Sequence, residues 1–437
     1  MIRDPEHEKM PREELERLQL ERLRVKVREV YERVPFYQQA FREKQVTPDD
    51  IQNLVDITKL PFTSKLDFRD NYPYGLLAVP MEQVVRIHAS SGTTGKPIIA
   101  PYTQGDINTW AEIMARLMAG AGVTKKDVVQ IAQGYGLFTG GLGFHYGTEC
   151  LGATVVPTAT GNTRRQILLL QDLGTTVLSC TPAYSLIISE TALEMGVDLR
   201  NTKLRLGLFG AEPWSEQMKK DIEERLGITA INCYGLTEVI GPGVSMECEH
   251  QCGMHIAEDH FLVEIIDPQT GEQLPYGEEG ELVITTLTKE AQPVIRFRTK
   301  DITSLNPEPC ACGRTLVRMS RITGRTDDML VVRGVNVFPS QIESVLLKVE
   351  GIEPHYLIVV DRQNVFSSDE LEVLVEVSET VFSGEKQIMA NLEKKLRSEM
   401  DSVLGISTRI KLVEPKTIAR SEGKAKRIVD RSELQSY

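Results

Sequence analysis

The sequence has no apolar run of membrane-spanning length and no excess of positive charge. A helix that crosses a bilayer needs about 20 consecutive apolar residues, and the first thirty residues are instead dense in Glu, Arg and Lys, unlike a secretory signal. The net charge is −12, which argues against a general affinity for nucleic-acid phosphates. We therefore expect a cytoplasmic protein that binds neither membranes nor nucleic acids.

Cysteine is also scarce, with seven residues in a chain of 437. An odd number of cysteines in a large chain without a secretory signal makes a disulfide framework improbable. We expect these thiols to be buried, catalytic or metal-bound. The proportions of hydrophobic (41%) and charged (26%) residues are those of a folded globular protein, and the length predicts two or three domains.

The chain divides into regions of different periodicity. Apolar residues at spacings of three to five between Leu15 and Val34 predict an amphipathic helix that Pro35 ends. Short apolar runs then alternate with helical patterns, which is typical of a parallel α/β sheet. The predicted strands are residues 84–89, 127–132, 153–157, 175–180, 204–209 and 228–233.

The second half of the chain has a different texture. Strand-like segments dominate residues 260–321, and after Gly324 alternation over residues 371–377 is followed by helical spacing of Ile388, Leu392 and Leu396. We expect a large α/β N-terminal domain, a β-rich part within it, and a small α+β C-terminal domain. The expected boundaries are residues 1–326 with a β-rich subdomain at about 256–322, and residues 328–437, with residue 327 at the junction.

The strongest local motif is Ser90-Ser91-Gly92-Thr93-Thr94-Gly95-Lys96-Pro97, directly after an apolar run. Glycines admit positive φ and let consecutive backbone N–H groups face a phosphate, to which hydroxyls and a lysine add further contacts. It is not a Walker A loop, because Ser90 stands where that motif requires Gly and Pro97 where it requires Ser or Thr. Taken alone, the stretch could equally be a surface turn.

Five further segments decide between a phosphate-binding loop and a surface turn. With the glycine-rich loop they resemble, in the same order, the signatures of the adenylate-forming (AMP-binding) superfamily. The short segment before the loop and residues 331–343 resemble its phenylacetate-CoA ligase family. The five segments are Gly210-Ala211-Glu212-Pro213, Tyr234-Gly235-Leu236-Thr237-Glu238, Arg298-Thr299-Lys300-Asp301, Gly324-Arg325-Thr326-Asp327-Asp328 and Arg420-Ser421-Glu422-Gly423-Lys424.

This resemblance implies an enzyme that uses ATP and Mg²⁺ to activate an aryl acid, most simply phenylacetate, and transfers the acyl group to coenzyme A. It implies that Lys424 bridges the carboxylate and the α-phosphate, that Thr237 binds the α-phosphate and that Glu238 holds Mg²⁺. The implied nucleotide-binding residues are Ser90, Ser91, Gly92, Thr93, Thr94, Gly95, Lys96, Gly210, Ala211, Glu212, Pro213, Tyr234, Gly235, Asp301 and Arg325.

The same resemblance assigns a hinge and a coenzyme A contact. Asp327 occupies the position at which the C-terminal domain would turn between the two half-reactions, and the segment Arg333-Gly334-Val335 would line the approach of coenzyme A. For the acyl group, aromatic rings next to glycines leave space for a flat ligand. The candidates are Tyr135, Phe138, Gly140 and Gly141, although core packing is an equal alternative for the two rings.

A group of cysteines and histidines predicts a structural zinc site. Zinc in closed sites takes four Cys or His ligands, and members of the phenylacetate-CoA ligase family often carry a Cys and a Gly-x-His in the first part of this group. Four unliganded side chains are the alternative, and Cys252 and His250 are reserve ligands. The expected ligands are Cys248, His255, Cys310 and Cys312.

Two other functions stay open at this stage. An adenylate-forming enzyme could load its acyl group onto a carrier-protein thiol instead of coenzyme A. The chain could also be a zinc-dependent interaction module with a degenerate site, although the presence of Lys424, Glu238 and Asp301 speaks against it. The resemblance further implies a homodimer that involves the N-terminal helix.

Overall fold

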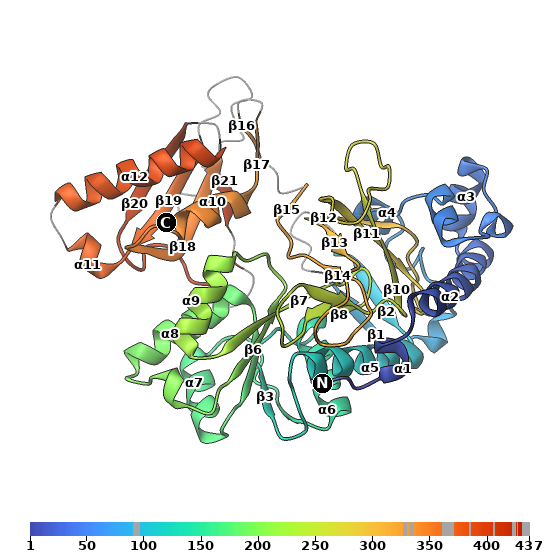
Figure 1. The fold of residues 1–437 in the computed structure, drawn as a ribbon, viewed down its shortest axis with the longest axis horizontal. Coiled ribbons are helices and arrows are strands. Elements are labelled where there is room, and N and C mark those ends of the chain that lie inside the picture. The colour runs from blue at the N-terminus through green and yellow to red at the C-terminus, as the bar shows by residue number, and fades with distance from the viewer. Residues whose placement is uncertain are drawn as a thin grey trace.

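The computed structural model describes residues 1–90, 97–326, 330–332, 335–360, 371–383, 386–404, 407–421, 425 and 427–430. A large N-terminal part and a smaller C-terminal part are evident (Figure 1), as predicted for an adenylation domain followed by an α+β domain. None of the described helices combines the length and apolar character needed to cross a bilayer.

The N-terminal segment is helical and packs on the main body. Val34 has an extended backbone, and Pro35 opens the next helix, because its fixed φ suits a first helical position. Leu15, Leu23, Val27 and Val30 are completely buried, which confirms the predicted amphipathic helix. The elements are α1 (Pro5–Glu8), α2 (Arg12–Arg33), α3 (Pro35–Lys44), η1 (Pro48–Asp50), η2 (Leu54–Lys59), α4 (Lys65–Asp70) and η3 (Met81–Gln83).

Five parallel strands form one half of a nine-stranded sheet, in the order β4-β3-β5-β6-β7. Their apolar side chains are buried between helices, so the predicted parallel α/β arrangement is correct here. The strands are β3 (Val128–Ile131), β4 (Thr154–Val156), β5 (Val177–Cys180), β6 (Leu206–Gly210) and β7 (Thr229–Leu236). The helices are α5 (Gln104–Gly120), α6 (Thr139–Leu151), α7 (Thr163–Asp172), α8 (Pro182–Glu194), η4 (Leu199–Asn201) and α9 (Glu216–Leu226).

One predicted strand lies elsewhere. β1 (Arg86–Ala89) pairs antiparallel with β2 (Ile99–Tyr102) in a separate two-stranded sheet, so the interpretation of residues 84–89 as part of the parallel sheet was wrong. The connection between the two strands is short, and a parallel pairing would need a crossover of a dozen or more residues. The consequence is that the glycine-rich segment joins two paired strands.

The region after β7 is β-rich, as predicted, but it contributes to two sheets. Four strands extend the nine-stranded sheet in the order β7-β8-β9-β14-β13, and four others form an antiparallel sheet. The first group is β8 (Gly241–Glu247), β9 (Met254–Ile256), β14 (Arg318–Met319) and β13 (Leu305–Asn306). The second is β10 (Phe261–Ile266), β11 (Gly280–Thr286), β12 (Phe297–Thr303) and β15 (Gly324–Arg325).

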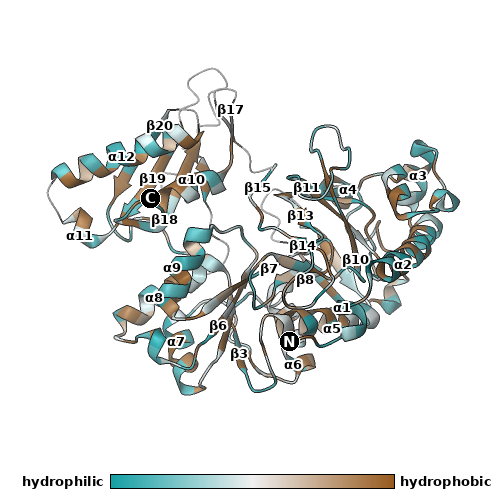
Figure 2. Cartoon of the chain, in the orientation of Figure 1, coloured by the Kyte–Doolittle hydropathy of each residue, from teal (hydrophilic) through white to brown (hydrophobic). Residues whose placement is uncertain are grey.

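The C-terminal part has a four-stranded sheet in the order β20-β19-β18-β21 and its own apolar core. Figure 2 shows brown, apolar strands in this part beside the teal residues of α12. The alternation predicted at 371–377 and the helix through Leu392 and Leu396 are both confirmed. The elements are β16 (Leu330–Val332), β17 (Val335–Val337), α10 (Pro339–Leu346), β18 (Ile352–Val360), β19 (Leu371–Val377), α11 (Glu379–Phe382), α12 (Lys386–Leu404), β20 (Thr408–Val413) and β21 (Ile428–Asp430).

Candidate active site

A cavity of about 520 Å³ opens at the carboxyl ends of the parallel strands. Ligands of open α/β sheets bind in this place, because the connecting loops leave a crevice there. The residues that line it come from after β3, β5 and β6 and from β7, and from the antiparallel region beyond them. They include Lys65, Ser90, Gln133, Phe138, Thr139, Gly140, Phe144, Gly210, Ala211, Glu212, Pro213, Trp214, Asn232, Tyr234, Gly235, Thr237, Glu238, Asp301, Arg321 and Arg325.

Ser90 fixes the base of the predicted phosphate loop. Its backbone N–H donates to the Ile98 carbonyl at 2.9 Å, and its hydroxyl accepts from the Ile98 N–H at 3.0 Å. Ser90 itself lines the cavity. The remaining predicted loop residues, Ser91, Gly92, Thr93, Thr94, Gly95 and Lys96, lie outside the described part of the chain.

Three predicted nucleotide residues meet on one wall. The Tyr234 hydroxyl on β7 donates to Oδ2 of Asp301 on β12 at 2.6 Å. The Arg325 guanidinium on β15 pairs with the other carboxylate oxygen, because the register of β12 and β15 places residues 301 and 325 opposite each other. Burial, reinforced by the Asp301 carboxylate, raises the pKa of Tyr234 well above its usual value, so its hydroxyl stays protonated and donates.

The other wall carries Thr237 and Glu238. The Thr237 hydroxyl lies 3.5 Å from that of Thr139, at the start of α6. The Glu238 side chain is 7% exposed, and its Oε1 lies 3.9 Å from Nζ of Lys65. A nearly buried carboxylate can hold a divalent cation on a phosphate, since Mg²⁺ prefers carboxylate and phosphate oxygens.

Sequence reasoning missed Lys65. Thr63 forms backbone hydrogen bonds with Arg296 and Arg298, and Phe62 lies under both guanidinium groups, which holds the start of α4 against β12. The pairing of Ser64 with Asp67 at the first turn of α4 could have been recognised as a helix start. No local pattern, however, indicates that this turn faces a cavity built by residues far along the chain.

The turn after β6 holds Gly210, Ala211, Glu212 and Pro213, all of which line the cavity. An ideal Cβ on Gly210 would lie 2.3 Å from the Cys233 carbonyl oxygen, so only glycine fits there. The Glu212 carboxylate accepts from the backbone N–H of Ala183 at 2.8 Å and of Ala425 at 2.9 Å. Burial raises the pKa of Glu212 although these two donors oppose the shift.

The predicted acyl-group residues divide into two pairs. Phe138 and Gly140 line the cavity, whereas Tyr135 and Gly141 are not among its lining residues. The Tyr135 hydroxyl lies 3.2 Å from Nδ1 of His145, so the ring is held against α6. A Cβ on Gly140 would approach the Gln133 amide oxygen to 2.5 Å. The lining residues that sequence reasoning missed include, besides Lys65, Gln133, Thr139, Phe144, Trp214 and Asn232.

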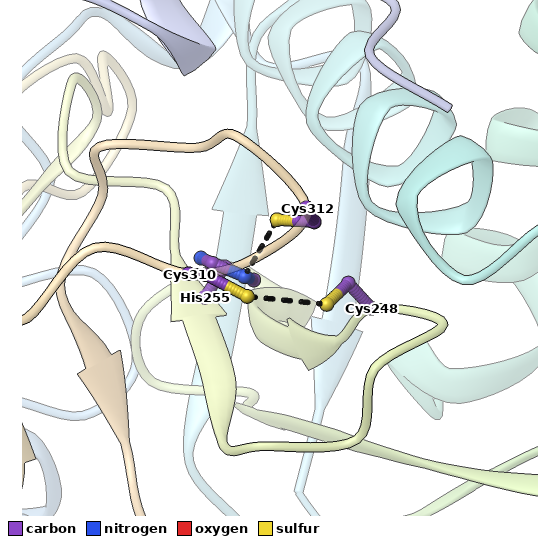
Figure 3. A group of neighbouring side chains, drawn as sticks. All are labelled: Cys248, His255, Cys310 and Cys312. Carbon is purple, nitrogen blue, oxygen red and sulfur yellow. Dashed lines mark hydrogen bonds between the residues drawn. The ribbon is translucent and has the colours of Figure 1, made fainter.

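The predicted zinc ligands lie together at the far end of the antiparallel strands. Cys248 follows β8, His255 lies in β9, and Cys310 and Cys312 lie in the loop between β13 and β14 (Figure 3). One ligand atom from each lies within 4.8 Å of the others. The Cys248 and Cys310 sulfurs are 3.8 Å apart, and Nε2 of His255 is 3.4 Å from the Cys312 sulfur.

Several predicted site residues cannot be placed. Lys424, Asp327, Arg333 and Gly334 lie outside the described residues. The backbone of Val335 is described, and it pairs with Val332 in the hairpin of β16 and β17.

The AMP-binding enzyme family matches residues 9–288, and the AMP-binding enzyme C-terminal domain matches residues 334–432. The phenylacetate-coenzyme A ligase of Thermus thermophilus is 49% identical over 98% of this chain and 99% of its own length. The phenylacetate-coenzyme A ligases of Aromatoleum evansii and Escherichia coli are each 51% identical, over 97% and 92% of this chain and 96% and 92% of their own lengths.

These matches and the site define the class: the chain is an adenylate-forming acid–thiol ligase of the AMP-binding enzymes. Near-full-length identity of about half then identifies the particular family. The chain belongs to the phenylacetate-coenzyme A ligases.

A solved relative indicates the orientation of the two domains. 2-Hydroxyisobutyryl-CoA ligase in its postadenylation state superposes with a TM-score of 0.93 at 29% identity, covering 99% of this chain and 93% of that one. The same enzyme in its thioesterification state gives 0.73 at 30% identity, covering 99% and 94%. The present structure therefore has the domain orientation of the postadenylation state.

Proposed function

We propose that this enzyme converts phenylacetate to phenylacetyl-CoA through a phenylacetyl-adenylate, with release of pyrophosphate and then AMP. The identity of about 50% to phenylacetate-coenzyme A ligases over nearly the whole chain carries this proposal. The cavity supports it, since Phe138, Phe144 and Trp214 supply aromatic surface on the same lining as the predicted nucleotide residues. Flat aryl groups pack well against such rings.

In the first half-reaction, the substrate carboxylate attacks the α-phosphorus of ATP and pyrophosphate leaves. Negative charge spreads over phosphate oxygens, so fixed positive charges and hydrogen-bond donors supply the catalysis. Thr237 donates to the α-phosphate, Lys424 bridges the carboxylate and that phosphate, and Glu238 would hold Mg²⁺. The pair of Asp301 and Arg325 supports binding of the ribose, since its carboxylate accepts from hydroxyl groups.

In the second half-reaction, the coenzyme A sulfur attacks the acyl carbon and AMP leaves. The C-terminal domain turns about Asp327, and Arg333, Gly334 and Val335 line the path of the coenzyme A arm. The two states of the 2-hydroxyisobutyryl-CoA ligase support such a turn. The same protein superposes on this chain with a TM-score of 0.93 in its postadenylation state and of 0.73 in its thioesterification state.

Cys248, His255, Cys310 and Cys312 hold a structural Zn²⁺ in this proposal. Tetrahedral zinc–thiolate bonds of about 2.3 Å place sulfurs about 3.8 Å apart, which is the separation of the Cys248 and Cys310 sulfurs. That separation is far too long for a disulfide. Four ligands would leave no open position on the metal for catalysis. Cys252 is the reserve ligand at 3.4 Å from the Cys310 sulfur.

A panel of arylacetic, benzoic, short aliphatic and fatty acids tests the substrate. With ATP, Mg²⁺ and coenzyme A, phenylacetate or a close arylacetate gives the highest kcat/KM, and higher turnover with acetate or a fatty acid contradicts the proposal. Formation of the adenylate without transfer to free coenzyme A would instead favour a carrier-protein loader.

We also propose that the enzyme is cytoplasmic and forms a homodimer. Light scattering after size exclusion would test the dimer.

A further inference from the structure

The Glu212 carboxylate joins the two domains. Its Oε1 accepts from the N–H of Ala183 in the first turn of α8, and its Oε2 accepts from the N–H of Ala425. Ala425 belongs to the C-terminal domain, where the nearby Arg427 carbonyl accepts from the Ile358 N–H of β18 at 2.7 Å. Because Ala425 directly follows Lys424 in the chain, Glu212 holds the backbone beside the predicted catalytic lysine.

A second carboxylate makes the reciprocal contact. Glu343 of α10, in the C-terminal domain, accepts at 3.1 Å from the N–H of Ser215, only three residues after Glu212. Its other oxygen accepts from the Tyr356 hydroxyl at 2.8 Å. The turn at residues 212–215 is therefore bound to the C-terminal domain by one carboxylate from each side.

A cation lies beside the Glu343 carboxylate. The Arg427 guanidinium is 3.9 Å from Oε2 of Glu343 and stacks over the Tyr356 ring at 4.3 Å. Burial lowers the pKa of Arg427, but Tyr356 and the carboxylates of Glu343 and Glu212 outweigh this effect and raise the pKa, so the arginine stays charged. This charge compensates two acidic groups that would otherwise repel each other across the interface.

These bonds depend on the orientation of the domains. Ala425 and Glu343 move with the C-terminal domain, whereas Glu212 and Ser215 belong to the N-terminal domain. The structure has the orientation of the postadenylation state of the 2-hydroxyisobutyryl-CoA ligase and differs from its thioesterification state. A large rotation of the C-terminal domain separates both pairs, so the clasp exists in the first orientation.

We propose that Glu212 is a positioning residue for adenylation, which holds the backbone of the C-terminal domain at Ala425, the residue that follows Lys424 in the chain, and that Glu343 completes this clasp. This inference rests on the proposed function. It assigns the Glu212 side chain a contact with the C-terminal domain in place of the predicted contact with the adenine. The clasp acts on the first half-reaction alone, because it breaks before the second.

Glu212→Gln tests this role in the full-length enzyme. An amide keeps one acceptor oxygen but puts an NH₂ group where the second N–H must be accepted. Single-turnover formation of phenylacetyl-adenylate falls about 10- to 100-fold, since misplacement of a catalytic group costs on that order, while KM for ATP changes little. Thioester formation from supplied phenylacetyl-adenylate and coenzyme A keeps its wild-type rate. Glu224→Gln, at an exposed carboxylate on α9, is the matched control and leaves both half-reactions unchanged.

Glu343→Gln distinguishes the clasp from a nucleotide contact, because Glu343 does not line the cavity. It slows adenylation selectively, as Glu212→Gln does. A rise in KM for ATP in Glu212→Gln alone, equal losses in both half-reactions, or unchanged adenylation in either variant overturns the inference. Wild-type enzyme that forms no adenylate from any aryl acid contradicts the proposed function instead.

Discussion

In the proposed mechanism, Lys424 supplies the positive charge that the first half-reaction requires. We predict that Lys424→Ala lowers adenylate formation by about 10² to 10³, as is typical when one preorganised charged contact is removed. Thioester formation from supplied acyl-adenylate stays near the wild-type rate, because the lysine acts in one orientation only. Measuring both half-reactions separately decides the matter, and equal losses would count against this division of labour.

Substitution of Asp301 tests whether the group of Tyr234, Asp301 and Arg325 binds the nucleotide. Asp301→Asn keeps the shape of the side chain but removes the charge that pairs with Arg325, and it leaves one acceptor oxygen for two donors, the Tyr234 hydroxyl and the Arg325 guanidinium. Hydrogen bonds to charged groups contribute about 1.5–3 kcal/mol each, so we expect KM for ATP to rise about 10-fold or more. Asp172→Asn, an exposed change on α7, serves as the control. An unchanged KM for ATP in Asp301→Asn would mean that Asp301 does not contribute to ATP binding.

How far the sequence predicts these residues depends on whether a local signature exists. Tyr234, Asp301 and Arg325 belong to recognisable motifs, and the structure brings all three together. Lys65 and Gln133 have no such signature. Lys65 reaches the cavity only because Phe62 and Thr63 bind to β12, more than two hundred positions away, and such contacts are set by tertiary packing rather than by local pattern.

At the scale of elements, the same limit explains the misplaced strand. A short strand-like segment such as residues 84–89 fits a parallel or an antiparallel strand equally well, because the period of the side chains is the same in both. The connection decides the pairing, and here the next strand begins at Ile99. Periodicity over longer segments was sufficient to predict β19 and α12, because their apolar positions recur several times.

The cluster of Cys248, His255, Cys310 and Cys312, where we propose a zinc ion, joins the end of β8 to β9 and to the loop between β13 and β14. Cys312→Ser removes one ligand, and we predict zinc well below one per chain and a Tm lower by about 5 °C or more. Cys150→Ser, a thiol outside the cluster, keeps both at the wild-type level. Elemental analysis and thermal unfolding provide the measurements. Wild-type protein that is folded, active and free of zinc would refute the site.

We predict that zinc binding at the proposed site is sensitive to acid, because three of the four proposed ligands are cysteines. Cysteine binds metal in its deprotonated form, so protons compete with zinc as the pH falls. Strong chelators should therefore remove the metal more readily at low pH. Loss of zinc should lower stability more than it alters kcat at moderate temperature, because a closed four-ligand site offers no position to a substrate.

At the scale of the whole molecule, the proposed mechanism requires one C-terminal domain to serve two reactions. In this proposal the domain presents the Lys424 loop to ATP first and then the segment 333–335 to coenzyme A. The clasp of Glu212 and Glu343 belongs to the adenylation arrangement of the domains, which is the arrangement in this structure. Two arrangements of rigid domains need a pivot of a few residues that absorb a change of φ and ψ.

Asp327 is the predicted pivot, and proline at this position would fix φ near −65° and restrict the turn. We predict that Asp327→Pro still forms phenylacetyl-adenylate at a near wild-type rate, because the adenylation orientation needs no turn from the one observed. Transfer to coenzyme A falls sharply, which is the reverse of the Lys424→Ala result. Asp327→Ala, which leaves φ free, keeps both steps and separates the loss of rotation from the loss of the carboxylate. Pre-steady-state measurement of acyl-adenylate and thioester decides it: unchanged thioester turnover in Asp327→Pro would mean that the domain turns at another residue.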